Sequence, residues 1–226
     1  MRKHCNIQDF FTEHIISYYR IFAKKKSMKL LYVFLFFTLI SASLSAQSYK
    51  TEIKTHAEDY YALLNTKDFD GILDYMYPKV FEMAPREQMK IGMQQMFNSK
   101  DMDIEFLSNT VERVTDTIKL DDKTYAALFY NSKMKMTFTS EKDKSKEEQK
   151  GFMDFIITTM DTQFGAENVT LDLENLSLII NMDANMFAIK DPQYDEWKFI
   201  GNDDAMKQLV DSIIPEKIRT KLLKWI

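Results

Sequence analysis

Residues that usually carry chemistry are scarce in this sequence. It has a single cysteine, Cys5, and three histidines, of which only His56 lies beyond the first 46 residues. Five glycines and four prolines are also few for 226 residues. One cysteine excludes an internal disulfide and a cysteine-ligated zinc site, and no glycine-rich loop is present to hold phosphate groups. We therefore expect no metal site and no cofactor.

Long apolar runs are missing as well, with one exception near the N-terminus. Lysines precede an apolar run at residues 30–40, which one threonine interrupts, and small residues follow at 41–46. Roughly 11 apolar residues suit a signal peptide, whereas a transmembrane helix needs about 20. We interpret residues 28–46 as a signal peptide cleaved after Ala46. Cleavage after Ser45, or retention of the segment as a membrane anchor, is the alternative.

Residues 1–27 precede this segment, although signal peptides begin at the N-terminus. Met28 is followed directly by Lys29 and the apolar run, so we predict that Met28 is the true start and that residues 1–27 are an upstream extension. A long basic leader is the alternative. The junction "SAQS" resembles that of exported bacterial proteins. We expect an exported protein, periplasmic or secreted, whose mature part is one domain of residues 47–226.

The predicted mature domain is acidic. Of 30 lysines and arginines and 34 aspartates and glutamates, residues 1–46 hold seven and two, so residues 47–226 carry a net charge of −9. An acidic surface repels phosphate backbones, which disfavours a nucleic-acid partner. About 180 residues suit a single domain with an adequate core.

Helical periodicity alternates with strand patterns along this domain. Asp68 is a suitable N-cap, Ser145 with Glu148 forms a capping-box pattern, and Gly165 is expected to end the helix that this pattern begins. Apolar spacings of three and four predict six helices, over residues 49–64, 69–76, 85–97, 145–164, 203–213 and 215–226. Alternation and Val, Ile and Thr content predict strands over residues 104–120, 123–140, 168–173, 176–190 and 196–201. This order predicts an α+β fold, with N-terminal helices packed on a curved antiparallel sheet, an inserted helix and C-terminal helices.

Two stretches carry a family resemblance. "AEDYYALLNTKDFDGILDYMYPKVFEMAPREQM" resembles the opening of a nuclear transport factor 2-like domain, and "MFAIKDPQYDEWKFIG" is similar to a late hairpin of that superfamily. The resemblance covers residues 49–140 and 167–202, and it implies a cone formed by a curved sheet and a long helix. The inserted helix at 145–164 and the C-terminal helices depart from it.

The resemblance also suggests where an acid/base site would lie. Enzymes of this superfamily, such as ketosteroid isomerase-like and polyketide cyclase-like proteins, place a carboxylate or a His-Asp pair inside the cone. The residues here that would fill this role are His56, Tyr60, Asp183 and Tyr130. A buried carboxylate with a raised pKa can abstract a proton. However, alternation places Asp183 opposite Met182 and Met186, which predicts a solvent-facing side chain, and His56 has no evident partner and is expected to be exposed.

The chain is rich in methionine, with 15 residues. Met89, Met93 and Met96 form one helical stripe, and Met134 and Met136 lie on one side of a strand. Thioethers are soft ligands that suit Cu(I), but methionine also fills irregular apolar cores. We favour the core and predict no metal.

Two helix faces are candidate contact surfaces. We predict that the inserted helix covers one face or mouth of the sheet with its apolar residues, among them Phe152, Phe155, Ile156 and Met160; presenting them to a partner is the alternative. The C-terminal helix has an apolar face that would suit a partner or a membrane surface, formed by Ile218, Leu222 and Trp225. Packing of this face on the sheet is the interpretation that we favour.

These observations favour an exported, non-enzymatic domain that binds a small molecule or a protein of unknown identity. One alternative is a cone-pocket acid/base enzyme of the ketosteroid isomerase or polyketide cyclase type. The other is association with a membrane surface through the C-terminal helix.

Overall fold

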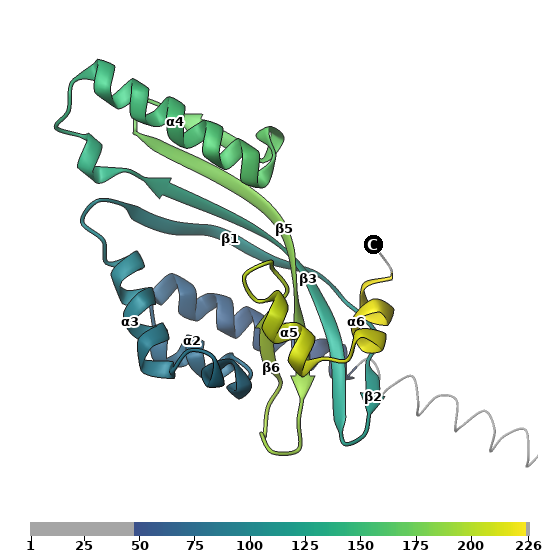
Figure 1. Cartoon of the computed structure of the whole chain (residues 1–226). Coiled ribbons are helices and arrows are strands. Elements are labelled where there is room, and N and C mark those ends of the chain that lie inside the picture. The colour runs from purple at the N-terminus through teal and green to yellow at the C-terminus, as the bar shows by residue number, and fades with distance from the viewer. Residues whose placement is uncertain (1–47, 225–226) are drawn as a thin grey trace, which may run out of the picture. The chain divides into compact units, whose positions relative to one another are not determined.

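The computed structural model describes residues 48–224, in which six strands form one open antiparallel sheet with helices packed on it (Figure 1). The predicted α+β class is confirmed. The upstream extension, the signal peptide and Trp225 lie outside the described residues. Within these residues, no helix is long and apolar enough to span a membrane.

Two long central strands organise the sheet. β3 (Lys123–Thr137) and β5 (Ser177–Lys190) pair along almost their whole length without a register shift. On each side of this central pair, two shorter strands pair with different parts of the same long strand. β1 (Asp103–Val114) and β2 (Ile118–Leu120) pair with β3, while β4 (Val169–Asp172) and β6 (Lys198–Gly201) pair with β5. The single strand predicted over residues 104–120 is therefore two strands, interrupted at residues 115–117.

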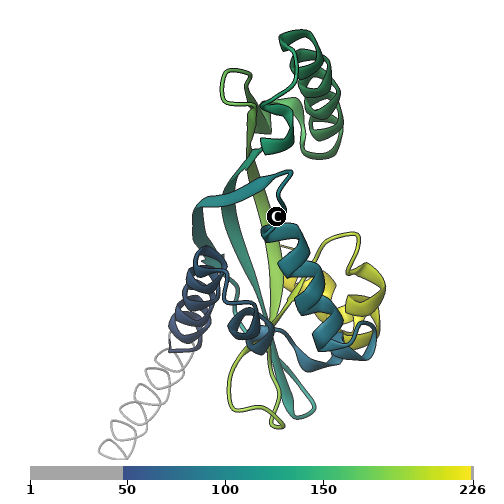
Figure 2. The ribbon, with the colours of Figure 1, turned by 90° about the vertical axis from the view of Figure 1, so that its left-hand side faces the viewer.

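Helices cover both faces of the part of the sheet that contains β2 and β6, which we call the β6 half. Because side chains alternate along a strand, Ala126 and Leu128 point to one face while Tyr125 and Ala127 point to the other. The first face packs on the N-terminal helix (residues 48–66). The second packs on α5 (Lys207–Ile213) and α6 (Glu216–Leu223). Figure 2 shows these helices on opposite sides of the strands.

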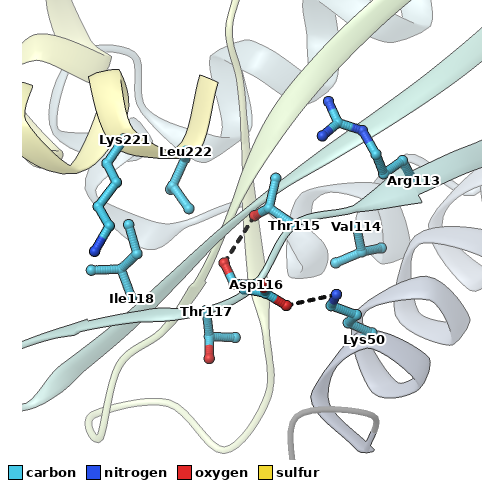
Figure 3. A pocket seen from close by; sticks show the side chains of 9 residues that line it. All are labelled: Lys50, Arg113, Val114, Thr115, Asp116, Thr117, Ile118, Lys221 and Leu222. Atoms are coloured by element: carbon cyan, nitrogen blue, oxygen red, sulfur yellow. Dashed lines mark hydrogen bonds and ion pairs between the residues drawn. The ribbon is translucent and has the colours of Figure 1, made fainter. Parts of the chain in front are cut away.

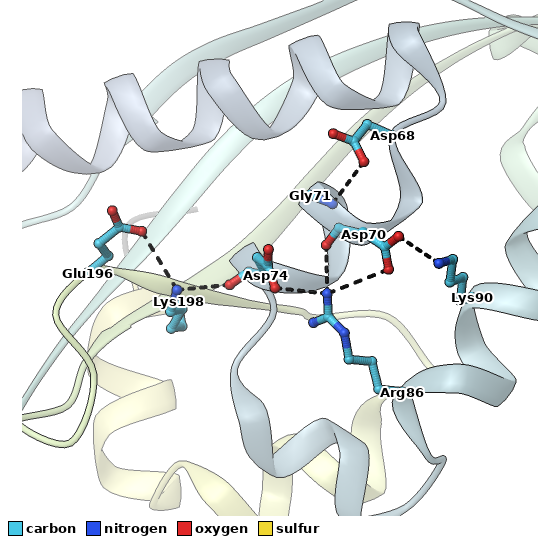
Figure 4. Close-up of polar contacts among 8 residues, drawn as sticks. All are labelled: Asp68, Asp70, Gly71, Asp74, Arg86, Lys90, Glu196 and Lys198. Carbon is cyan, nitrogen blue, oxygen red and sulfur yellow. Dashed lines mark hydrogen bonds and ion pairs between the residues drawn. The ribbon is translucent and has the colours of Figure 1, made fainter.

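Three short elements connect the N-terminal helix to the sheet: α2 (Phe69–Tyr75), the 3-10 helix η1 (Pro78–Glu82) and α3 (Arg86–Phe97). The predicted N-cap is confirmed, since the Asp68 side chain accepts a hydrogen bond from the Gly71 amide. Arg86 lies 2.8 Å from Asp74, and Lys90 lies 2.6 Å from Asp70 (Figure 4). These contacts join α2 to α3, although exposed ion pairs add little stability.

The other end of the sheet, which contains β4 and which we call the β4 half, is covered by α4 (Lys146–Phe164). The predicted capping box of Ser145 and Glu148 is present. Gly165 follows the helix with a φ of 88°, a conformation that side chains disfavour, and so ends it as predicted. Met136 of β3 contacts both the α4 core and the core formed by α2 and α3.

Candidate functional site

The space between the N-terminal helix and the sheet, where the resemblance places a cone pocket, is filled by aromatic side chains. The Tyr60 ring centroid lies 5.5 Å from that of Tyr61 and 6.3 Å from those of Tyr75 and Phe199. Tyr61 in turn lies 5.4 Å from Tyr130. Burial, with a smaller effect of Tyr130, raises the pKa of Tyr60 to about 12. This phenol stays protonated near neutral pH and cannot act as a general base there.

The remaining acid/base candidates do not converge. His56 is half-buried rather than exposed; its ring packs edge-on at 6.0 Å against Tyr75, and Nδ1 has no hydrogen-bond partner among the described residues. Asp183 is exposed, as alternation predicts, and accepts a 2.8 Å hydrogen bond from Asn131. By strand alternation, Asp183 lies on the face opposite the one that receives the N-terminal helix. Within residues 48–224, therefore, neither His56 nor Tyr60 is paired with a carboxylate.

The methionines of the predicted stripe are dispersed over different contacts. Met89 packs against the core beside α5 and α6, whereas Met93 packs with Met134 and Met136 in the core of α2 and α3. Met96 is 47% exposed. Met93 therefore shares an apolar core with Met134 and Met136, as expected for methionines that fill a core. Among the described residues, no group of three histidine, cysteine, aspartate or glutamate side chains is arranged to hold a metal ion.

The inserted helix α4 covers the sheet with only part of the face that we predicted. Met153 is fully buried, and Phe152, Ile156 and Met160 pack around it as half-buried side chains. Phe155 is 67% exposed, so its predicted burial is wrong. Each helical residue turns by about 100°, which places Phe155 about 200° from Met153 and on the outer side of the helix.

The C-terminal helix α6 packs on the sheet. Ile218 and Leu222 are buried, at 5% and 2% exposure, in the same core as Phe187 and Ile189 of β5. The favoured interpretation, packing on the sheet, is thus confirmed for these two residues, and their alternative assignment to a partner or membrane face is wrong in this structure. Trp225, the third residue of that face, lies outside the described residues.

A buried ionic cluster near the sheet end was not predicted. Asp191, 2% exposed, accepts hydrogen bonds from Tyr77 at 2.7 Å and from Lys123 at 2.8 Å. Tyr77 and Asp191 are 114 positions apart, so no local motif signals their contact. Burial of the Tyr77 ring, followed by its hydrogen bond to Asp191, raises the pKa of Tyr77 to about 12, which suits a structural donor rather than a base.

Three cavities lie along the edge strand β1. Two of them, of about 490 Å³ and 370 Å³, lie between β1 and the N-terminal helix, near Lys54 and near Leu64 respectively. A third, also of about 490 Å³, continues past the end of β1 to α6 and shares Lys50, Arg113 and Val114 with its neighbour. We call this row of cavities the β1 groove. None of the three is lined by His56, Tyr60, Tyr130 or Asp183.

The edge strand itself is irregular. The pairing of β1 with β3 shifts register between Phe106 and Ser108 and again between Val111 and Arg113. Such bulges disfavour the addition of another strand to an exposed edge. Bulges also change the direction in which side chains point. Leu107, at the first shift, is 45% exposed and lines the cavity near Leu64. The groove therefore favours a ligand held by side chains over one paired along the backbone.

Comparison with known proteins finds no relative, since no family model, no curated protein and no solved structure matches the chain. The geometry of the groove and of the filled interior is thus the basis for any functional interpretation.

Proposed function

We propose that this protein is an exported, non-enzymatic binding domain that holds a small molecule or a protein segment in the β1 groove. The observation that carries the proposal is the position of the cavities. Three cavities lie along β1, whereas aromatic side chains occupy the interior where a cone-pocket enzyme would bind its substrate. Pockets of about 300 to 1,000 Å³ are typical of ligand sites.

The proposal includes export and a nuclear transport factor 2-like ancestry. Export is supported by the apolar run at residues 30–40 and the small residues after it. The ancestry is supported by the order of elements, in which helices precede a curved antiparallel sheet. Fold alone implies no activity, and the acid/base candidates lie apart, so an enzymatic function has no comparable support.

The test is capture by wild-type protein and by a variant with a filled groove. Thr55 is exposed on the N-terminal helix and lines the cavity near Lys54, so Thr55→Trp fills that cavity. Ala62 is exposed on the same helix and lines none of the three cavities, so Ala62→Trp is the matched control. Small molecules and proteins bound by the immobilised variants are compared by mass spectrometry. We expect wild type and Ala62→Trp to retain a species that Thr55→Trp loses; equal retention by all three would exclude the groove.

A further inference from the structure

Positive side chains gather in one part of the β1 groove, at the break between β1 and β2. The cavity there, of about 490 Å³, is lined by Lys50, Arg113 and Lys221 and by a single carboxylate, that of Asp116 (Figure 3). The predicted mature domain as a whole carries a net charge of −9. Three cations around one carboxylate therefore reverse the charge of the domain locally, which attracts anions.

Two of these cations have no acidic partner among the described residues. Lys50 Nζ lies 2.7 Å from Asp116 Oδ1, whereas no ion pair joins Arg113 or Lys221 to a described carboxylate. The guanidinium carbon of Arg113 lies 4.0 Å from the centre of the Phe129 ring. Stacking on an aromatic face orders a guanidinium and leaves its N–H groups open at the rim. Arg113 is thus a donor held in place before any ligand arrives.

The strand break adds backbone donors at the same place. Pairing of β1 with β3 ends at Val114, the Thr115 amide donates to the Ala127 carbonyl, and pairing resumes at Ile118. The amides of Asp116 and Thr117 lie outside these ladders. Figure 3 shows Arg113 and Lys221 on either side of Thr115. Exposed amides beside cationic side chains are a recurrent anion-binding arrangement.

We propose that the cavity at the β1–β2 break binds a ligand that carries anionic groups, carboxylates or phosphates, which Arg113 and Lys221 contact. The Lys50–Asp116 pair does not close the site, because Asp116 is 87% exposed and exposed pairs exchange readily with other ions. This inference rests on the proposed function, because the cavity is one end of the β1 groove. It adds that the ligand bound in the groove carries negative charge.

The experiment titrates the isotope-labelled protein, purified after expression of the full chain, with inorganic phosphate and separately with citrate, at constant ionic strength. We expect the amide signals of residues 115–118 to shift. Arg113→Gln and Lys221→Gln should each weaken binding by about tenfold, because each removes a charge-assisted hydrogen bond. The anion that binds more tightly identifies phosphate or carboxylate as the preferred group.

Charge-matched controls distinguish a site from general attraction. Lys217 lies one turn earlier on α6 and Lys133 lies on β3; both are exposed, and neither lines this cavity. Lys217→Gln and Lys133→Gln should leave the affinity within about twofold, since distant exposed charges are screened. If Arg113→Gln unfolds the protein, Lys221→Gln and Arg113→Lys are compared with wild type instead. Equal losses in all variants, or no shift with either anion, would overturn the inference. If capture depends on Thr55 but neither anion shifts the amide signals, only this inference is overturned and the proposed function stands.

Discussion

At the scale of single residues, the buried carboxylate of Asp191 is the charged group that depends most on its partners. Burial opposes ionisation of this carboxylate, but hydrogen bonds from Lys123, the Gln193 amide and Tyr77 outweigh it, so the pKa of Asp191 lies below its ordinary value. The hydrogen bond to Asp191, followed by that to Tyr77, raises the pKa of Lys123. Each partner thus keeps the other charged, and the cluster fastens η1 to the start of β3 and the end of β5.

Asp191→Asn should lower the free energy of unfolding by about 3 kcal/mol. This is the lower end of the range for breaking a buried ion pair, because Lys123 keeps some contact with water. Urea unfolding at pH 7 measures the loss. Lys190→Gln is the control, since the neighbouring Lys190–Glu52 pair is longer, at 3.3 Å, and more exposed on its acidic side; we expect it to change stability by at most about 1 kcal/mol. Equal effects of the two substitutions would mean that the buried cluster contributes no more than a surface pair.

The same substitution should change the acid limb of the stability curve. A carboxyl whose pKa is lowered by folding stabilises the protein above its unfolded pKa, about 3.9 for aspartate, and loses that contribution as the pH falls through its folded pKa. Wild type and Asp191→Asn should therefore converge in stability below about pH 4. A difference that stays constant down to pH 2 would show that Asp191 does not titrate with unfolding.

At the scale of elements, local signals predict where a helix begins and ends better than they predict which side it buries. The Asp68 N-cap, the Ser145 capping box and the Gly165 terminus are local hydrogen-bond or backbone effects, and all three are confirmed. The apolar residues of α4 surround more of the helix than the sheet can cover, so composition alone does not separate Phe155 from Met153. The break between β1 and β2 lies where pairing with β3 stops after Val114 and resumes at Ile118, which no pattern within residues 104–120 reveals.

Substitutions in α4 should separate its two sides. Met153→Ala should lower the free energy of unfolding by about 2 to 4 kcal/mol, because it leaves a cavity under a fully buried side chain. Phe155→Ala, on the exposed side, should change it by no more than about 0.5 kcal/mol. Thermal or urea unfolding of the two variants measures both. A large effect of Phe155→Ala would indicate that a second molecule covers the outer side of α4.

At the scale of the whole molecule, the order of helices and strands is enough to predict an α+β fold, but not how its interior is filled. The aromatic contacts of Tyr60 and Tyr61 join the N-terminal helix to residues of α2, β3 and β6. Those partners are distant in the sequence, so the filling of the space between the N-terminal helix and the sheet is visible only in three dimensions. The β1 groove is equally non-local, because the N-terminal helix, β1 and α6 each supply part of its lining.

The two halves of the sheet differ in how they are covered, and this should set the order in which the protein opens. The β6 half lies between helices on both faces. The β4 half has helices on one face, while the other carries polar side chains such as Lys133, Asn181 and Asp183. Regions with fewer buried apolar contacts open at lower free energy.

Native-state hydrogen exchange should therefore give the highest opening free energies to amides of residues 125–128 and 186–189. The amides of α4 and β4 should exchange through a smaller, sub-global opening that responds weakly to denaturant, because the m-value scales with the surface exposed. Met153→Ala should speed amide exchange in α4 and β4. The opening of this region should remain separate from the opening that exposes the slowest amides. Identical opening free energies and m-values in both halves would instead mean that α4 and the helices of the β6 half unfold as one cooperative unit.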